Sequence, residues 1–258
     1  MKKQGFTLAE VLITLGLLGV VAAITLPALF NNVEKHKWEN GLKAAYNIMT
    51  NGFAEMMAEE GVDNLKDTAL WRECVMGKTI ANSTLQENGK CAVKHFKNYF
   101  NAASVENGVP RDITIYDLHN SIATTDMGET IRFTLSNNMT LNAMFLYVDD
   151  RSRSECNTIK ENGGSMCSVV SNIFVDVNGN KKPNTIGKDI YYFEVDKYGK
   201  VYPEGGLDET LFDKNTATEA NWKSTCNGKP VPASCSGMTS FNLTARVVED
   251  GYRINYLK

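Results

Sequence analysis

The chain has 258 residues, of which 43% are apolar and 22% are charged, and its mean hydropathy is −0.28. This composition supplies enough apolar material for a folded core, but it excludes a protein that crosses a bilayer many times. Twenty-seven Lys and Arg residues stand against 30 Asp and Glu residues, which gives a net charge of −3. Because there is no basic excess to hold a polyphosphate backbone, the composition argues against nucleic-acid binding.

The first 30 residues contain only three charged side chains, those of Lys2, Lys3 and Glu10. The uncharged run over residues 11–30 is about as long as a helix that crosses a hydrocarbon layer of roughly 30 Å. It predicts a membrane helix or a secretory signal. A signal is disfavoured because its apolar region is usually about 7–15 residues long and rarely holds a carboxylate. No cation follows until Lys35, so we expect the partner of Glu10 to come from another molecule.

Residues 2–10 have the sequence KKQGFTLAE and lead directly into this apolar run. The segment resembles the leader and first helix of type IV prepilins and type II secretion pseudopilins. The resemblance implies that a membrane-embedded prepilin peptidase cuts after Gly5 and methylates Phe6, the new N-terminus. It also implies that Glu10 neutralises the α-ammonium group of a neighbouring subunit, which would pair the carboxylate inside the lipid.

Three helix-weakening residues, Gly16, Gly19 and Pro27, interrupt the apolar run. Membrane helices often tolerate such residues without further consequence. The resemblance implies an alternative, in which the stretch between Gly19 and Pro27 loses helical structure when subunits pack into a filament.

Beyond Phe30 the pattern predicts an amphipathic helix over residues 31–60. Apolar side chains recur every three or four residues and share one face: Trp38, Leu42, Ala45, Met49, Phe53 and Met56. The opposite face carries Glu39, Lys43, Asn47 and Glu55. Such a stripe could line a ligand groove, but it more often packs on a core, so we expect it to lie on a head domain.

The rest of the chain shows strand signals, with apolar residues at alternate positions between turn-forming clusters. We predict strands, most of them in hairpins, over residues 131–135 with 139–148, 171–177, 190–195 with 200–202, and 241–248 with 252–256. Residues 62–110 are predicted to be a mixed helical and loop insertion. Strands grouped after a long helix indicate the α+β class, with the helix packed on an antiparallel β-sheet head.

These signals divide the chain into three parts: a leader (residues 1–5), a transmembrane and assembly helix (6–30) and a head (31–258). The two lysines of the leader favour its retention in the cytoplasm. We therefore expect a single-pass protein of the cytoplasmic membrane, with its head outside the cytoplasm.

Six cysteines all follow the apolar run: Cys74, Cys91, Cys156, Cys167, Cys226 and Cys235. Their even number predicts disulfides and an extracytoplasmic head, with buried free thiols as the alternative. A zinc site is disfavoured because the chain has no Cys-x-x-Cys or Cys-x-x-His pair. Among the fifteen pairings that six cysteines allow, we favour pairing with the nearest neighbour along the chain, because short loops close locally. That pattern joins Cys74 to Cys91, Cys156 to Cys167 and Cys226 to Cys235.

A candidate calcium loop begins at Asp176, where oxygen-bearing side chains alternate through Asn178 and Asn180. Asn184 and Asp189 follow closely enough to complete it. The bidentate Glu expected at the twelfth position is replaced by glycine, and two lysines lie within the segment. An Asn-Gly turn that leaves a strand is the simpler interpretation, and calcium stays as the alternative.

The sequence gives no support for catalysis. The three histidines are scattered, and the chain contains no zinc-protease helix motif, nucleophile elbow or phosphate-binding loop. We therefore expect a structural protein rather than an enzyme. By the resemblance, its polymerisation depends on a separate cytoplasmic ATPase and a membrane platform protein.

Together, these features predict a structural subunit of a type IV pilus or a type II secretion pseudopilus. The large head favours a minor or specialised subunit over a major one. The alternative is a membrane-anchored extracytoplasmic protein whose head binds a ligand or adheres to a surface. Cleavage at Gly5 and incorporation into a filament distinguish the two hypotheses.

Overall fold

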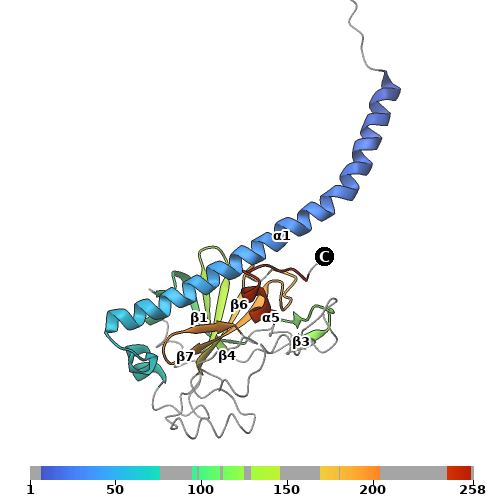
Figure 1. Ribbon diagram of the computed structural model, residues 1–258. Helices are drawn as coiled ribbons and strands as arrows, with labels where there is room; N and C mark the ends of the chain where they lie inside the picture. Colours follow the sequence, from blue (N-terminus) through green and yellow to red (C-terminus); the bar gives the residue numbers. More distant parts are fainter. Residues whose placement is uncertain are drawn as a thin grey trace, which may run out of the picture.

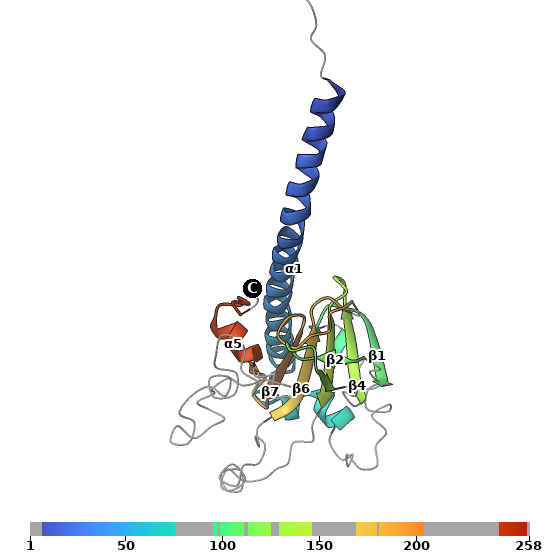
Figure 2. The same cartoon turned by 90° about the vertical axis from the view of Figure 1, so that its right-hand side faces the viewer.

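The computed structural model consists of one long helix, α1, laid across a β-sheet head (Figure 1). It describes residues 7–75, 95–97, 99–110, 113–124, 129–145, 169–179, 181–203 and 243–256. Figures 1 and 2 both show the N-terminal half of α1 extending away from the head, while the C-terminal half lies on it.

The helix α1 runs without interruption over Leu8–Glu60. A capping box between Thr7 and Glu10 opens it and satisfies N–H groups that no helical carbonyl reaches. It ends at Gly61, whose φ of 63° is a left-handed conformation that glycine adopts at little cost. Pro27 lies inside the helix and does not end it. The predicted membrane helix and amphipathic helix are therefore one element.

The head contains a six-stranded antiparallel sheet with the order β1-β4-β5-β6-β7-β8. Its strands are β1 (Ala102–Pro110), β4 (Glu129–Leu135), β5 (Thr140–Phe145), β6 (Val169–Asp176), β7 (Ile190–Asp196) and β8 (Val201–Pro203). The two predicted hairpins that correspond to β4 with β5 and to β7 with β8 are confirmed, and so is the predicted strand that corresponds to β6. A long helix on an antiparallel sheet confirms the α+β class.

A second, smaller sheet pairs β2 (Ile115–Tyr116) with β3 (Ile122–Thr124). Ile115 packs with Phe174, Ile186 and Ile190 in a cluster separate from the main core. Because neighbouring residues of a strand point to opposite faces, Phe174 faces away from the side of β6 that carries Ile173. This cluster therefore lies on the sheet face opposite α1.

In the predicted insertion over residues 62–110, the structure describes residues 62–75, 95–97 and 99–110, and residues 62–75 are helical and irregular. The insertion contains the short helices η1 (Leu65–Asp67) and η2 (Trp71–Val75), and it ends in strand β1. Strand β1 was not predicted, because its last four residues are Asn-Gly-Val-Pro, a combination that is rare in strands. An edge strand tolerates proline, and β1 pairs only with β4, with two register shifts.

The hairpin predicted over residues 241–248 and 252–256 is wrong. Residues Leu243–Glu249 form the helix α5, and no strand follows over residues 252–256. Leu243 and Val247 lie one helical turn apart and are both fully buried, and α5 packs against β7 and β8. Strand propensity is weak, so this packing overrides the β-branched composition of the segment.

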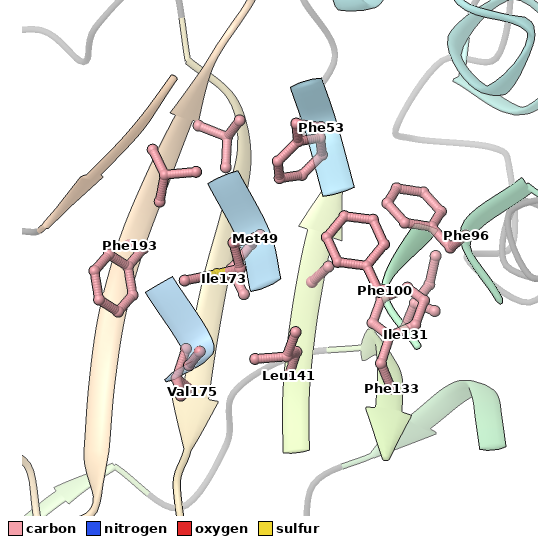
Figure 3. Close-up of a cluster of buried hydrophobic side chains, with 14 of the residues drawn as sticks. Met49, Phe53, Phe96, Phe100, Ile131, Phe133, Leu141, Ile173, Val175 and Phe193 are labelled. Atoms are coloured by element: carbon pink, nitrogen blue, oxygen red, sulfur yellow. The ribbon is translucent and has the colours of Figure 1, made fainter. Parts of the chain in front are cut away.

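The main core lies between α1 and one face of the sheet (Figure 3). The predicted apolar stripe is confirmed, since five of its side chains have no exposed surface and the sixth is partly buried: Leu42, Ala45, Met49, Phe53, Met56 and, partly, Trp38. Phe53 meets the edge of the Phe100 ring at a centroid distance of 5.1 Å. Phe96 and Phe133, 5.1 Å apart, extend this aromatic group toward β4.

Glu39 does not belong to an exposed polar face, as the spacing had predicted. Only 11% of its side chain is exposed. One carboxylate oxygen accepts a hydrogen bond from the backbone N–H of Ile254 at 2.9 Å, and the other lies 2.9 Å from Nδ1 of His36. Helical periodicity could not foresee that the C-terminal segment returns to this point of α1. Glu39 therefore ties the end of the chain to the helix.

Candidate functional site

The N-terminal half of α1 exposes nearly all of its apolar side chains. The exposed fraction is 71% for Ile13, 66% for Leu17 and 72% for Ile24. By length and composition, α1 is the one helix of the described chain that is able to cross a membrane, and none of its most apolar window is buried in the structure. A helix with apolar side chains on every side is stable only when this surface is buried. The N-terminal half of α1 therefore needs lipid or other protein around it.

Glu10 is held in the capping box at the start of this helix. Its Oε2 accepts hydrogen bonds from the backbone N–H and the hydroxyl of Thr7, at 2.8 and 2.9 Å. In return, the N–H of Glu10 donates to Oγ1 of Thr7 at 3.3 Å. Thr7 carries no charge, so these bonds orient the carboxylate without neutralising it. Gly5 and Phe6, the predicted cleavage site, lie outside the described residues.

Gly19 and Pro27 both lie within the unbroken part of α1, so the structure holds the isolated chain in the helical form of this stretch. A Cβ added at Gly16 or Gly19 would meet no atom within 4 Å. The predicted unwinding in a filament remains a prediction.

The connection between β6 and β7 brings four of the five candidate calcium ligands together around the buried carboxylate of Asp189. Its Oδ2 accepts from the backbone N–H of Asn184 at 2.8 Å and from the amide of Asn178 at 2.9 Å. Its Oδ1 accepts from the backbone N–H of Thr185 at 2.6 Å. Oδ1 of Asp176 accepts from the backbone N–H of Asn178 at 3.2 Å. Asn180 lies outside the described residues.

Burial raises the pKa of Asp189 to about 6, against the opposing effect of these N–H donors. The amide nitrogen of Asn178 donates to the carboxylate of Asp189 at 2.9 Å and to the carbonyl of Lys182 at 3.3 Å. This donor occupies the position beside the carboxylate where a bound cation would otherwise be expected. The side-chain oxygens of Asn178 and Asn184 are buried and have no hydrogen-bond partner among the described residues. The geometry is that of a strand-leaving loop fixed by its own side chains, and calcium binding stays a prediction. From the sequence, Asp189 is predicted only to complete the loop, because distance along the chain does not reveal which residue lies at the loop centre.

Across the described residues, no group of three or more His, Cys, Asp or Glu side chains is arranged to hold a metal ion. Cys74 is buried and disulfide-bonded. The other five cysteines lie outside the described residues. The structure therefore shows that Cys74 takes part in a disulfide, and the three predicted pairings stay predictions.

A polar hollow of about 300 Å³ lies beside the loop centred on Asp189, and the sequence analysis did not anticipate it. It is lined by Glu106, Arg132, Thr134, Asn138, Thr140, Asn178 and Lys181. Arg132 donates from Nε to Asn142 at 3.2 Å and lies 3.6 Å from the carboxylate of Glu106. These residues are dispersed over three strands and two connections, so no local motif marks them.

Comparison with known families places a match at the N-terminus alone. Residues 1–26 match the family model described as the prokaryotic N-terminal methylation motif, which is the signature of type IV prepilins and pseudopilins. No curated protein and no solved structure matches the chain. The match spans the leader and most of the exposed half of α1, and it does not extend into the head.

Proposed function

We propose that this chain is a structural subunit, minor or specialised, of a type IV pilus or a type II secretion pseudopilus. One observation carries the proposal: a single helix joins the methylation motif to the core of the head. The exposed apolar half lies in lipid before assembly and against other subunits afterwards. Because the buried half of the same helix forms the head core, packing the exposed half in a filament fixes the position of the head.

Processing is proposed to occur after Gly5, with methylation of Phe6. The helix begins at Leu8 and its capping residue is Thr7, so the described helix lies entirely on the C-terminal side of this cut. Removal of the leader would therefore leave α1 intact. The capping box keeps Glu10 close to the new N-terminus. There its carboxylate can give up a hydrogen bond from Thr7 and pair instead with the α-ammonium group of a neighbouring subunit.

The proposed partners are a prepilin peptidase, other pilin or pseudopilin subunits, a membrane platform protein and a cytoplasmic assembly ATPase. The ATPase is needed because the sequence carries no phosphate-binding loop. The head is proposed to lie outside the cytoplasm. The disulfide at Cys74 supports this location, since such bonds persist in oxidising compartments.

Mass spectrometry of the mature protein tests the processing step. A methylated Phe6 at the N-terminus is expected, and an N-terminus near Leu29 would contradict the proposal by indicating a cleaved secretory signal. Gly5→Leu should leave the uncut form in the membrane, because a bulky side chain keeps the scissile carbonyl from the peptidase. Gln4→Leu, a matched change at the neighbouring leader residue, should still be cut.

A membrane-anchored ligand-binding protein is the second candidate, and the polar hollow around Arg132 is the observation that favours it. The two candidates differ in where the mature chain resides. Mass spectrometry of purified surface filaments should detect the chain if it is a subunit, and its abundance relative to the other subunits should show whether it is minor. A chain that stays entirely in the membrane fraction would favour the second candidate.

A further inference from the structure

Charge is distributed unevenly between the two ends of the head. The contact between Gly41 and Val177 fixes one end, because Val177 begins the connection between β6 and β7. The turn between β7 and β8 fixes the other end, where Gly199 packs against Phe53 and Met57. Gly41 and Phe53 are twelve residues apart on α1, and twelve residues of helix rise about 18 Å. The two ends of the head are therefore well separated along the helix.

The end near Gly41 is basic. The described lysines and arginines there are at least partly exposed: Lys35, Lys37, Lys181, Lys182, Lys188 and Arg253. Most acidic groups at this end are already engaged, since Glu39 accepts from Ile254, Asp189 is buried in its loop and Asp250 lies 4.0 Å from Arg246. Glu34 and Glu249 are the exposed acidic groups in this part of the described chain. The other end carries five acidic side chains, at Glu55, Glu59, Glu60, Asp63 and Asp67, against four basic ones, at Lys66, Arg72, Lys197 and Lys200.

The basic end faces the membrane-spanning half of α1. Figure 2 shows the red segment that follows α5 beside α1, at the end of the head from which the free part of the helix emerges. Lys35 and Lys37 follow the uncharged run by five and seven residues, which places them about 8 to 11 Å beyond its last residue. The headgroup layer of a bilayer is roughly 5 to 8 Å thick on each side, so these two lysines lie at its outer edge.

The loop lysines lie near the level of Gly41, about 16 Å beyond the end of the uncharged run. Their long side chains bring the ammonium groups within about one Debye length, roughly 10 Å at 0.1 M salt, of the headgroups. We propose that the basic end of the head docks on anionic phospholipid headgroups at the outer surface of the cytoplasmic membrane. The docking holds the unassembled subunit in a fixed orientation. The docking rests on one part of the proposed function, the embedding of α1 in the membrane, and does not depend on filament assembly.

Lysine acylation of the full-length protein in nanodiscs tests this docking. One set of discs contains only phosphatidylcholine, and the other is half phosphatidylglycerol. A water-soluble acylating reagent is added, and mass spectrometry gives the rate at each lysine. Lys181 and Lys182 should react about threefold to fivefold more slowly in the anionic discs. Lys197 and Lys200, at the opposite end of the head, should react at the same rate in both lipids and serve as the internal control.

Half-molar sodium chloride should remove the difference at Lys181 and Lys182, because screening weakens attraction between exposed charges. The double variant Lys181→Glu and Lys182→Glu should also lose the lipid-dependent protection of Lys188. The matched variant Lys197→Glu and Lys200→Glu should keep it. Equal rates at Lys181 in both lipids, or protection that persists in high salt, would overturn the docking. A chain that fails to copurify with the discs would instead contradict the membrane embedding itself.

Discussion

Along α1, the large apolar side chains of residues 8–30 are exposed, whereas the apolar stripe from Leu42 to Met56 has no exposed surface. The backbone is the same in both halves, and no break separates them. The difference comes from the surroundings, since the second half packs on the sheet and the first half has no partner among the described residues. Substitutions in the two halves should therefore act on different processes, assembly in the first and folding in the second.

The largest expected effect belongs to Glu10, in the exposed half. Glu10→Val should leave insertion and cleavage intact, since it removes a charge from the membrane helix, but should nearly abolish incorporation into filaments. Quantitative mass spectrometry of sheared filaments measures this loss. Normal filament yield would remove the charge-pairing role.

Glu10→Gln provides the matched control, because glutamine can keep the capping box with Thr7 while losing the charge. If the charge matters, this variant should fail in assembly like Glu10→Val. Recovery of wild-type yield would assign the role of Glu10 to capping the helix.

Phe53→Ala should instead disrupt folding. Phe53 is fully buried and packs on the rings of Phe96 and Phe100, so its truncation should lower the free energy of unfolding by about 3 to 5 kcal/mol. Thermal unfolding of the detergent-solubilised protein measures the change. Leu17→Ala, in the exposed half, should leave the melting temperature nearly unchanged. Equal losses from both substitutions would contradict the proposed division of the helix.

The glycines of α1 offer a smaller test of the same division. A Cβ at Gly41 would lie 2.9 Å from Cβ of Val177, so Gly41→Ala should destabilise the head by about 1 to 3 kcal/mol. Gly19→Ala meets no atom within 4 Å and should be neutral, or stabilising by up to about 1 kcal/mol through helix propensity. The melting temperature should thus fall for Gly41→Ala and stay the same or rise for Gly19→Ala, and a stabilised Gly41→Ala would contradict the close contact with Val177.

Calcium provides a test in the head, in the loop that follows Val177. If Asp176, Asn178 and Asn180 bind calcium, one formal charge among three ligands predicts a dissociation constant of roughly 0.1 to 1 mM. At tenfold excess over that constant, the native state should gain about 1.4 kcal/mol. The melting temperature should then rise in calcium and return with chelator, and Asp176→Ala should lose this shift. If the melting temperature does not change with calcium, the loop is a simple turn that binds no calcium.

The smallest expected effect is the pH dependence that comes from Asp189. Its pKa is about 6 in the folded protein, above the ordinary 3.8, so folding favours the protonated form. Stability should therefore fall as pH rises through this range, by about 1 kcal/mol between pH 5 and pH 7. Melting curves at the two pH values measure the difference. Asp189→Asn should reduce it, and an unchanged pH dependence in this variant would assign the titration to another group.

The sequence by itself determined the elements whose signal is local. Residues 2–10 carry the processing motif, the stripe ending at Met56 has helical spacing, and the hairpin of β4 and β5 follows from alternation around a turn. Each of these patterns depends on neighbours within a few positions along the chain. For that reason the class of the fold and the nature of the N-terminus were predictable.

Only the tertiary structure decided the features that depend on distant segments. The C-terminal residues became α5 because the helix is buried against β7 and β8, although their composition favours a strand. Glu39 became a buried acceptor because Ile254, 215 residues away, returns to it. Asp189 became the centre of its loop because backbone N–H groups converge on it only after the chain folds. Burial and hydrogen bonding between remote residues outweigh local propensity at these positions, and no local pattern encodes them.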